Sequence, residues 1–282
     1  MELKKATRKK VKLRMGLSAV SGGGKTMSAL LLAYGITGDW SKIAVIDTEN
    51  GSASLYSHLG EFNTIDLQPP YAPERYIEAI KSCEKALIDV CIIDSITHEW
   101  EGKGGCLDIV ESVTQQSQSK NSYTAWAKVT PRHNDFVDCI LSSNMHIITS
   151  VRRKQDYEMS KNSAGKTVVE KAGLKEITRE GFEYELSLNL NISLNHFATA
   201  SKDRTGLFMD KPEFIITSET GKMIKEWCEQ GIIEDSEYFT NQLNDSIDLK
   251  QLTERYTALP GNYKEQLKQV ATDKRLKLTL TK

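Results

Sequence analysis

Short runs of apolar residues, separated by polar segments, recur along the chain. The runs at 43–46, 90–93 and 146–151 are almost continuous, which is typical of strands buried on both faces of a parallel sheet. In the run 11–17, apolar and polar residues alternate before a loop of small residues begins. Apolar residues at helical spacing lie between these runs, for example at 76–88. Strands that alternate with helices predict an α/β fold in which helices flank a mainly parallel central sheet.

Later segments predict antiparallel structure and further helices. Residues 182–195 alternate strictly between apolar and polar, which predicts one long antiparallel or edge strand toward the C-terminal side of the sheet. Thr130 and Pro131 look like the N-cap and the first residue of a helix. Residues 155–180 carry many charges and few large apolar groups, so they predict a mobile loop or an exposed hairpin.

The pattern changes again beyond Gly231. Residues 226–248 carry acidic groups and neither lysine nor arginine. After this acidic segment, apolar residues return at helical spacing. We therefore expect a main domain at 1–230 and a small helical C-terminal region at 231–282.

Composition and charge limit the classes of function. Of the 282 residues, 39% are hydrophobic and 27% are charged, as in ordinary globular proteins. No apolar run reaches membrane-spanning length and the first residues lack the apolar core of a secretion signal, so we expect a cytoplasmic protein without a membrane partner. The five cysteines and five histidines are scattered without a metal-binding spacing, which predicts reduced cysteines and no zinc site. The net charge of −1 provides no overall attraction to nucleic acid.

The strongest chemical motif follows the run 11–17. It matches the phosphate-loop pattern G-x-x-x-x-G-K-[ST], with Ala19 in the position of the first glycine. Three consecutive glycines let several backbone N–H groups point at one anion. The helix that follows adds the positive end of its dipole. The motif therefore predicts a binding site for the phosphates of ATP.

Each residue type in this loop has an expected role. We expect Lys25 to reach the β- and γ-phosphates, and the hydroxyl of Thr26 to hold Mg²⁺. The predicted nucleotide-binding residues are Ser21, Gly22, Gly23, Gly24, Lys25, Thr26 and Met27. The helix after Thr26 should bury Met27, Leu30, Leu31 and Tyr34 and end near Gly35. The alternative is a flexible Ser-Gly turn beside a surface lysine.

Acidic residues follow two of the buried runs. An apolar strand that ends in Asp94, after a phosphate loop, is typical of the Walker B residue that holds Mg²⁺. Glu49 would face the same edge of the sheet, where a carboxylate can orient the water that attacks ATP. Thr26 and Asp94 are thus the predicted metal ligands, and Lys25 and Glu49 are predicted catalytic residues. Alternatively, Glu49 caps the turn at 50–51.

The order of these motifs resembles RecA-type recombinases and implies a RecA-like P-loop NTPase core. The stretches that carry the resemblance are 19–26, 46–49, 92–95 and 202–206. In RecA the carboxylate at the end of the second strand is the catalytic one, which corresponds to Glu49. The stretch 202–206 looks like the K-N-R-F-G motif of the RadA branch, from which Asp203 and Thr205 depart. The resemblance implies that Lys202 and Arg204 act on a neighbour's nucleotide, in a homo-oligomer with nucleotide sites at subunit interfaces.

Residues 10–228 as a whole resemble the RecA-like ATPases that bacteriophages encode. The stretches that carry this second resemblance are 94–100, 125–133, 179–185 and 202–206. Some members of that group are associated with single-strand annealing proteins and phage recombination. The resemblance thus implies a single-strand annealing protein as a candidate partner, and the bacterial host cytoplasm as the location.

The segment 152–176 corresponds in position to the second DNA-binding loop of RecA. Its cations Arg152, Arg153 and Lys154 could follow a phosphate backbone and are the predicted nucleic-acid contacts. Acidic residues dilute this charge, so a solvated hairpin without a DNA role is the alternative. The favoured function is an ATPase that assembles on single-stranded DNA and assists phage recombination, repair or replication. A nucleotide-dependent oligomeric switch that binds a protein partner is the alternative function, and a helicase or packaging motor is less favoured.

Overall fold

The structure, a computed structural model, describes residues 8, 10–117, 120–161, 167–230, 236–259 and 261–280. The chain forms two compact units. One comprises Lys12–Cys228, and the other comprises Met1–Val11 together with Glu229–Lys282. The larger unit carries all of the nucleotide-binding motifs found in the sequence.

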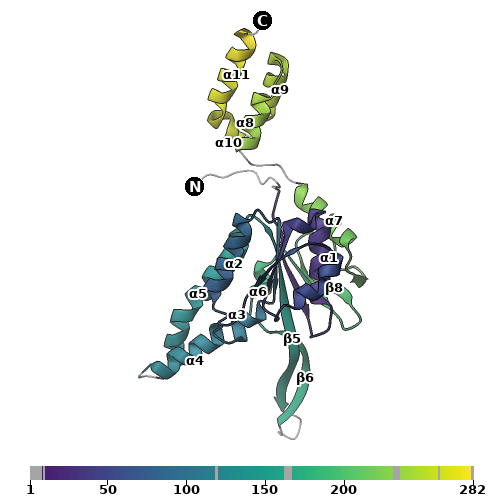
Figure 1. Cartoon of the computed structure of the whole chain (residues 1–282), viewed down its shortest axis with the longest axis vertical. Coiled ribbons are helices and arrows are strands. Elements are labelled where there is room, and N and C mark those ends of the chain that lie inside the picture. The colour runs from purple at the N-terminus through teal and green to yellow at the C-terminus, as the bar shows by residue number, and fades with distance from the viewer. Residues whose placement is uncertain are drawn as a thin grey trace. The chain divides into compact units, whose positions relative to one another are not determined.

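The larger unit is built on a nine-stranded sheet with the strand order β3-β2-β4-β5-β1-β7-β8-β9, and β6 pairs with β5 outside this path (Figure 1). The pairs from β3 to β7 are parallel. The β5–β6, β7–β8 and β8–β9 pairs are antiparallel. The strands are β1 (Arg14–Ala19), β2 (Ile43–Asp47), β3 (Asn63–Asp66), β4 (Val90–Asp94), β5 (His146–Lys161), β6 (Thr167–Glu176), β7 (Leu188–Ile192), β8 (Phe197–Asp203) and β9 (Phe214–Ile215). This confirms the predicted, mainly parallel α/β sheet with antiparallel strands toward its C-terminal side.

Helices cover both faces of the sheet (Figure 1). One buried cluster joins α1 and α7 to strand residues such as Val45 and Ile92. A second cluster joins α2 and α5 to their neighbours Ile46 and Ile93. Successive strand residues point to opposite faces and both faces are covered, which explains the almost continuous apolar runs. The helices are α1 (Lys25–Thr37), α2 (Pro73–Lys85), α3 (Thr97–Glu101), α4 (Cys106–Gln116), α5 (Ser122–Ser142), α6 (Phe182–Glu185) and α7 (Ser218–Glu229), with 3-10 turns at Trp40–Lys42 and Ser52–Leu59.

Residues 182–195 do not form the single long strand that their alternation predicts. The segment begins with the one-turn helix α6, and only its middle forms β7. Gly181 has a φ of 94°, a left-handed conformation that turns the chain into α6. Tyr184 and Leu194 are 68% and 67% exposed, so the apolar positions do not share one buried face. Alternation predicts a strand only where one side of the segment is covered.

Helix α5 begins earlier than the sequence predicts. Its N-cap is Asn121, whose side chain accepts a hydrogen bond from the backbone N–H of Tyr123. Thr130 and Pro131 therefore lie inside the helix and not at its start. The prediction was wrong because proline is also tolerated within a long helix whose packing supports it, at the loss of one backbone hydrogen bond.

Helix α1 also differs from its predicted form. Leu30 is buried as expected, but Met27, Leu31 and Tyr34 are only half-buried. The helix continues past Gly35, where an added Cβ would lie 2.0 Å from the carbonyl oxygen of Ser218. Gly35 therefore serves the close packing of α1 against α7. The helix ends at Thr37.

Strands β5 and β6 form a long antiparallel hairpin that projects beyond the rest of the sheet (Figure 1). Their pairing extends from Arg153 opposite Glu176 to Lys161 opposite Thr167. The sequence predicted either a mobile loop or an exposed hairpin here, and the structure shows the hairpin. Residues 162–166, and the side chains of 157–172, lie outside the described part of the chain.

The smaller unit is helical, which confirms the predicted helical C-terminal region. Its helices are α8 (Ser236–Asn244), α9 (Leu249–Ala258), α10 (Gly261–Gln266) and α11 (Lys268–Leu280). They enclose a core of their own, made by Leu243, Leu252, Leu259, Tyr263 and Leu267.

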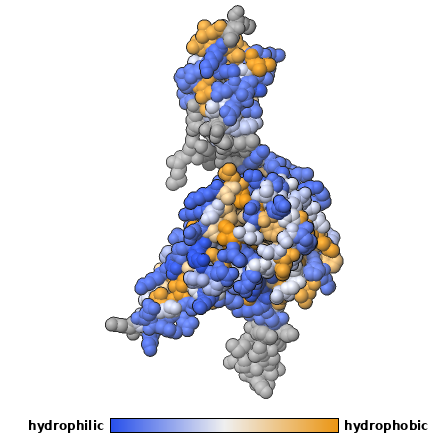
Figure 2. Space-filling view, viewed as in Figure 1, coloured by the Kyte–Doolittle hydropathy of each residue, from blue (hydrophilic) through white to orange (hydrophobic). Residues whose placement is uncertain are grey.

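The surface is mixed in character. Figure 2 shows hydrophobic residues scattered among hydrophilic ones on the face in view. Isolated apolar side chains such as Leu55 and Leu87 are exposed, which is normal for a globular surface. None of the helices in the described ranges has the length and apolar character needed to cross a membrane.

Candidate nucleotide-binding and catalytic site

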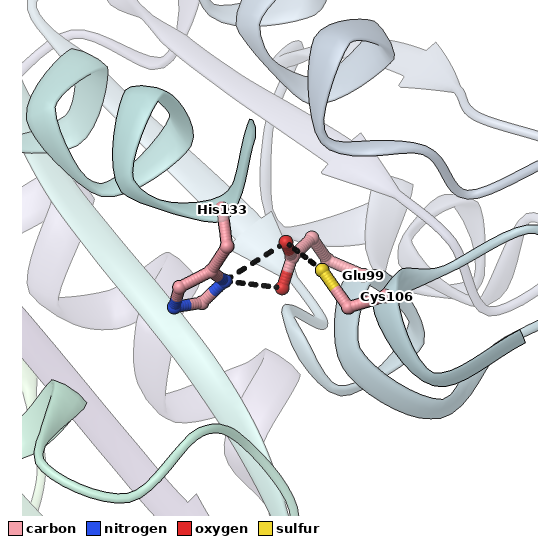
Figure 3. A group of neighbouring side chains, drawn as sticks. All are labelled: Glu99, Cys106 and His133. Carbon is pink, nitrogen blue, oxygen red and sulfur yellow. Dashed lines mark hydrogen bonds and ion pairs between the residues drawn. The ribbon is translucent and has the colours of Figure 1, made fainter. Parts of the chain in front are cut away.

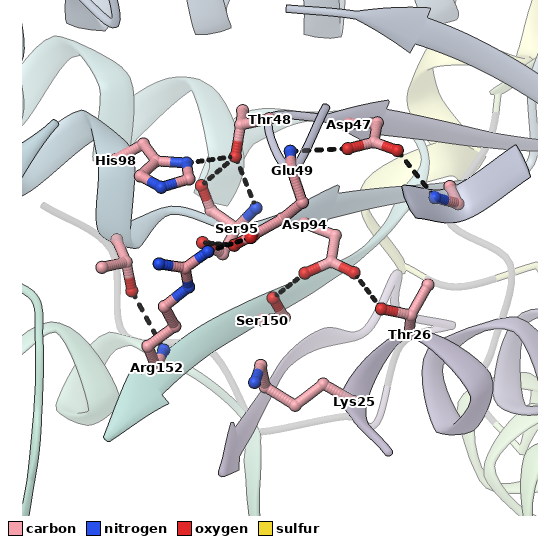
Figure 4. Close-up of polar contacts among 12 residues, drawn as sticks. Lys25, Thr26, Asp47, Thr48, Glu49, Asp94, Ser95, His98, Ser150 and Arg152 are labelled. Atoms are coloured by element: carbon pink, nitrogen blue, oxygen red, sulfur yellow. Dashed lines mark hydrogen bonds and ion pairs between the residues drawn. The ribbon is translucent and has the colours of Figure 1, made fainter. Parts of the chain in front are cut away.

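The carboxyl ends of β1, β2 and β4 meet at one edge of the sheet because these strands run parallel. Strand β5 lies between β1 and β4 and brings its own residues to the same edge. Asp47 pairs with Asp94 across β2 and β4, and Ala19 pairs with Arg152 across β1 and β5. Ligands of open α/β sheets bind at this edge, so it is the expected place for a site (Figure 4).

Two left-handed glycines shape the loop between β1 and α1. Gly22 has a φ of 81° and Gly24 a φ of 84°, which glycine adopts without steric cost. Gly24 is the N-cap of α1, whose first residue is Lys25. A Cβ at Gly24 would in addition lie 3.0 Å from Nδ1 of His196. The loop thus directs the N-terminal end of a 13-residue helix at the pocket, which suits a phosphate group.

A pocket of about 540 Å³ opens over this loop, within the range of ~300–1,000 Å³ that is usual for cofactor sites. Of the predicted nucleotide-binding residues, all but Gly23 line it. Charged residues share the lining with apolar ones: Lys25, Glu49, Asp94 and Arg152 on the one hand, and Leu31, Tyr56, Ile215 and Ile216 on the other. A nucleoside triphosphate needs both kinds of surface, charged groups for its phosphates and apolar groups for its base.

Lys25 lies over the phosphate loop. Its Nζ donates hydrogen bonds to the carbonyl oxygens of Ala19 and Val20, at 3.4 and 3.3 Å. Burial lowers the pKa of its ammonium group, and the Asp94 and Glu49 carboxylates partly offset this effect. The ammonium group lies between the loop and the two carboxylates, a position that suits a phosphate contact.

Both carboxylate oxygens of Asp94 accept hydrogen bonds from hydroxyl groups. The hydroxyl of Thr26 donates to Oδ2 and that of Ser150 to Oδ1 (Figure 4). Asp94 is 2% exposed. Magnesium prefers oxygen ligands such as a hydroxyl and a carboxylate, so the contact between Thr26 and Asp94 fits the metal position expected from the sequence. Ser150, at the end of the buried part of β5, was not predicted.

Glu49, two residues beyond the carboxyl end of β2, is held by two partners. Ser95 Oγ donates to its Oε1 at 3.1 Å, and the guanidinium group of Arg152 forms an ion pair with its Oε2 (Figure 4). Its neighbour Asp47 has another role, because both of its oxygens accept backbone N–H groups, from Glu49 at 2.6 Å and Ala53 at 2.7 Å. Asp47 therefore shapes the turn, while the carboxylate of Glu49 faces the pocket.

A further hydrogen-bond network fixes the backbone next to Glu49. The hydroxyl oxygen of Thr48 accepts the backbone N–H of Ser95 at 2.8 Å and contacts Nδ1 of His98, also at 2.8 Å. Burial lowers the pKa of His98. The ring of His98 stacks on Tyr71, with centroids 4.9 Å apart. These contacts join the ends of β2 and β4, which keeps Glu49 and Asp94 in a fixed relation.

The pocket also contains His196, which the sequence did not single out. Its Nδ1 lies 3.4 Å from the carbonyl oxygen of Gly23, and its backbone has a φ of 66°. His196 reaches the phosphate loop from the turn between β7 and β8. Only the pairing of β7 with β1 brings this turn near the loop, so no local pattern in the sequence could have indicated it.

The three cations predicted to contact nucleic acid lie on three different surfaces. Arg152 lines the nucleotide pocket and pairs with Glu49. Arg153 donates to the carbonyl oxygen of Leu174 at 2.8 Å, within the hairpin. Lys154 is exposed and lies 3.9 Å from the carboxylate of Glu101. Neighbouring side chains point to opposite sides of a strand, which separates Arg153 from Arg152 and Lys154. Lys154 lies two residues farther along β5 than Arg152 and contacts α3 instead of the nucleotide pocket.

Lys202 and Arg204 do not line the nucleotide pocket of their own chain. Lys202 donates hydrogen bonds to the carbonyl oxygens of Glu183 and Tyr184, and Arg204 donates to that of Tyr184 at 3.4 Å. Burial lowers the pKa of Lys202, and the charge of Arg204 adds to this effect. Asp203 organises the turn between them, since its carboxylate accepts several backbone N–H groups, for example that of Phe208 at 2.7 Å.

A phosphate loop, a Walker B aspartate and a carboxylate at the neighbouring strand end define a P-loop NTPase. Residues 11–221 match the AAA domain family, so the chain belongs to this family of nucleotide-dependent ATPases. Nucleotide binding in such a domain usually involves Mg²⁺. None of the curated proteins compared with the chain matches it.

Lys25→Ala is expected to abolish detectable ATP binding, because the loss of a charged hydrogen-bond donor to phosphate raises Kd by at least about 10–100-fold. Lys25→Arg should also bind poorly, since a planar guanidinium group does not fit a site built for a compact ammonium group. Titration with a fluorescent ATP analogue measures both. The exposed Lys211→Ala is the matched control, and unchanged affinity in Lys25→Ala would contradict the phosphate-loop assignment.

Proposed function

We propose that this chain is a RecA-like ATPase that hydrolyses ATP with Mg²⁺, assembles as a homo-oligomer and acts on single-stranded DNA in phage recombination, repair or replication. The observation that supports this proposal best is that β5 contributes residues both to the nucleotide pocket and to a second groove. This strand carries Arg152 in the nucleotide pocket, and two residues later Lys154 lines a groove at the base of the hairpin. The same strand thus extends from the nucleotide pocket to the groove that we propose for DNA.

Each of the pocket's polar residues would have a separate role in hydrolysis. Lys25 and the N-terminus of α1 would hold the β- and γ-phosphates. Thr26 and Asp94 would hold Mg²⁺, which supplies positive charge to the phosphates. Glu49 would orient the attacking water and accept its proton. Because Arg152 occupies one oxygen of Glu49, we expect Arg152 to turn toward the γ-phosphate before Glu49 acts.

The groove beside the hairpin has features that suit single-stranded nucleic acid. Its volume is about 750 Å³. Trp100 and Trp126 line it with stacked indole rings, 5.5 Å apart, and Tyr123 lines it with a side chain that is 81% exposed. Lys154 and Lys175 lie along the same groove. Unpaired bases stack on aromatic side chains whatever their sequence, while cations follow the backbone.

This groove has four carboxylates and three cations in its lining: Glu101, Asp156, Glu176 and Glu180, and Lys154, Lys175 and Arg179. Lys154 lies near Glu101, and Lys175 forms an ion pair with Glu180. Phosphates would have to compete with these carboxylates for the cations. We therefore expect stacking on the aromatic residues to contribute most of the affinity, and the dependence of binding on salt to be shallow.

The proposal is tested by the ATPase rate with and without single-stranded DNA, at two salt concentrations. We expect single-stranded DNA to raise kcat and duplex DNA to have a smaller effect. Electron microscopy with a non-hydrolysable ATP analogue should show an ordered assembly on the DNA. ATP hydrolysis that is indifferent to nucleic acid would instead favour a nucleotide-dependent switch with a protein partner.

Tyr123→Ala is expected to weaken binding of single-stranded DNA by about 1–3 kcal/mol, the usual contribution of one stacked base. Its side chain is 81% exposed, so the substitution should leave the fold intact. The control is Tyr238→Ala, which removes an exposed tyrosine from the other unit. Fluorescence anisotropy with labelled oligonucleotides measures both, and equal affinity in the two variants would exclude this groove as the DNA site.

A further inference from the structure

Three side chains that commonly bind metals meet between α3, α4 and α5 (Figure 3). Oε1 of Glu99 lies 3.0 Å from Sγ of Cys106 and 3.0 Å from Nδ1 of His133. The three groups lie within 4.8 Å of one another. Their exposed fractions are 1%, 0% and 4%. This cluster could not be recognised in the sequence, because Cys106 and His133 lie 7 and 34 residues from Glu99 and follow no metal-binding spacing.

The geometry points to a binding site for a zinc-like divalent cation at Glu99, Cys106 and His133. A thiolate, an imidazole and a carboxylate are the protein ligands that zinc takes, whereas magnesium and calcium favour oxygen alone. The charges also balance, because one divalent cation neutralises one thiolate and one carboxylate. Charge balance matters here, since a buried charge without a partner is costly.

Two of the three distances between ligand atoms require only a small adjustment. Tetrahedral zinc, with ligands at about 2.0–2.3 Å, holds neighbouring ligand atoms about 3.5 Å apart. The two contacts to Glu99 measure 3.0 Å, so the side chains must separate by about half an ångström to admit the ion. His133 also lines a pocket of about 470 Å³, so the cluster borders this pocket on the side of His133.

The location indicates what the ion would do. Glu99 lies on α3, Cys106 is the first residue of α4, and His133 lies in the middle of α5. The buried apolar cluster that these helices share is small: Cys106, Val110, Ala125 and Val129. A cation bound by all three helices would therefore stabilise this part of the fold, because its binding free energy adds to that of folding. The same helices carry Trp100 and Trp126, so the ion would also fix the aromatic groove.

Cobalt alone is the most direct probe, because a thiolate ligand to Co²⁺ gives an intense charge-transfer band in the near ultraviolet. The full chain is first stripped with a chelator and then titrated with Co²⁺. We expect the band to saturate at one equivalent and to disappear when Zn²⁺ is added. Ions bound near Thr26 and Asp94 have only oxygen ligands and give no such band, so the test is independent of the proposed ATPase.

Two variants and a matched control identify the ligands. Cys106→Ser should abolish the charge-transfer band, and His133→Gln should weaken cobalt binding at least tenfold. Cys139→Ser removes a thiol on α5 that is not part of the cluster, so it should leave the titration unchanged. Circular dichroism confirms that each variant folds. A wild-type chain without the band, or a band that survives in Cys106→Ser, would show that the cluster is only a hydrogen-bonded group around a buried carboxylate.

Discussion

Glu49→Gln is expected to lower kcat for ATP hydrolysis by about 10²–10⁴-fold while ATP and Mg²⁺ still bind, because glutamine keeps the shape of the side chain but cannot accept the proton of the attacking water. Steady-state kinetics and titration with a fluorescent ATP analogue measure the two quantities separately. The exposed Glu61→Gln is the matched control. Normal turnover in Glu49→Gln would place the base elsewhere.

The ion pair with Arg152 offers a second way to examine Glu49. If Glu49 only holds Arg152 in place, Arg152→Ala should lower kcat as much as Glu49→Gln does. If Glu49 acts on the water, Arg152→Ala should retain more activity, because the carboxylate remains in the pocket. The second result is expected, since Ser95 still orients the carboxylate through its Oε1.

The residues that could be predicted lie at the ends of parallel strands. Asp94 and Glu49 each follow an almost continuous apolar run, and such runs predict neighbouring buried strands whose carboxyl ends meet at one edge. The phosphate loop could also be predicted, because its residues are consecutive in the chain. In these cases the position of each residue at the end of a buried strand could be read from the nearby sequence alone.

Contacts that depend on strand order or side-chain direction could not be predicted. Arg152 and Glu49 are 103 residues apart, and they meet because β5 lies between β1 and β4. The charged stretch after Arg152 predicted either a mobile loop or an exposed hairpin, and only the strand of the hairpin places Arg153 on the other side from Arg152 and Lys154. The segment 182–195 shows the opposite error, since its regular alternation predicts one strand but its first residues form helix α6.

Lys202 and Arg204 remain predicted contributors to a nucleotide site on a neighbouring subunit. Their contacts are with the carbonyl oxygens of α6, outside the pocket of their own chain. Arg204 is exposed, and an exposed cation of this kind stabilises a fold only slightly. Placed against a γ-phosphate, the same cation would stabilise the charge that develops during phosphoryl transfer. Arg204→Ala is therefore expected to lower kcat by about 10³–10⁵-fold, as for other arginine fingers.

A mixing experiment separates action on a neighbour from action within one chain. Glu49→Gln protein has an intact Arg204, and Arg204→Ala protein has an intact pocket. In an assembly with head-to-tail interfaces, about one quarter of the interfaces in an equal mixture pair the two intact halves, so activity should rise to roughly that fraction of the wild-type rate. Glu61→Gln mixed with wild type controls for subunit exchange. If the cations act within their own chain, every subunit stays defective and the mixture is no more active than its components.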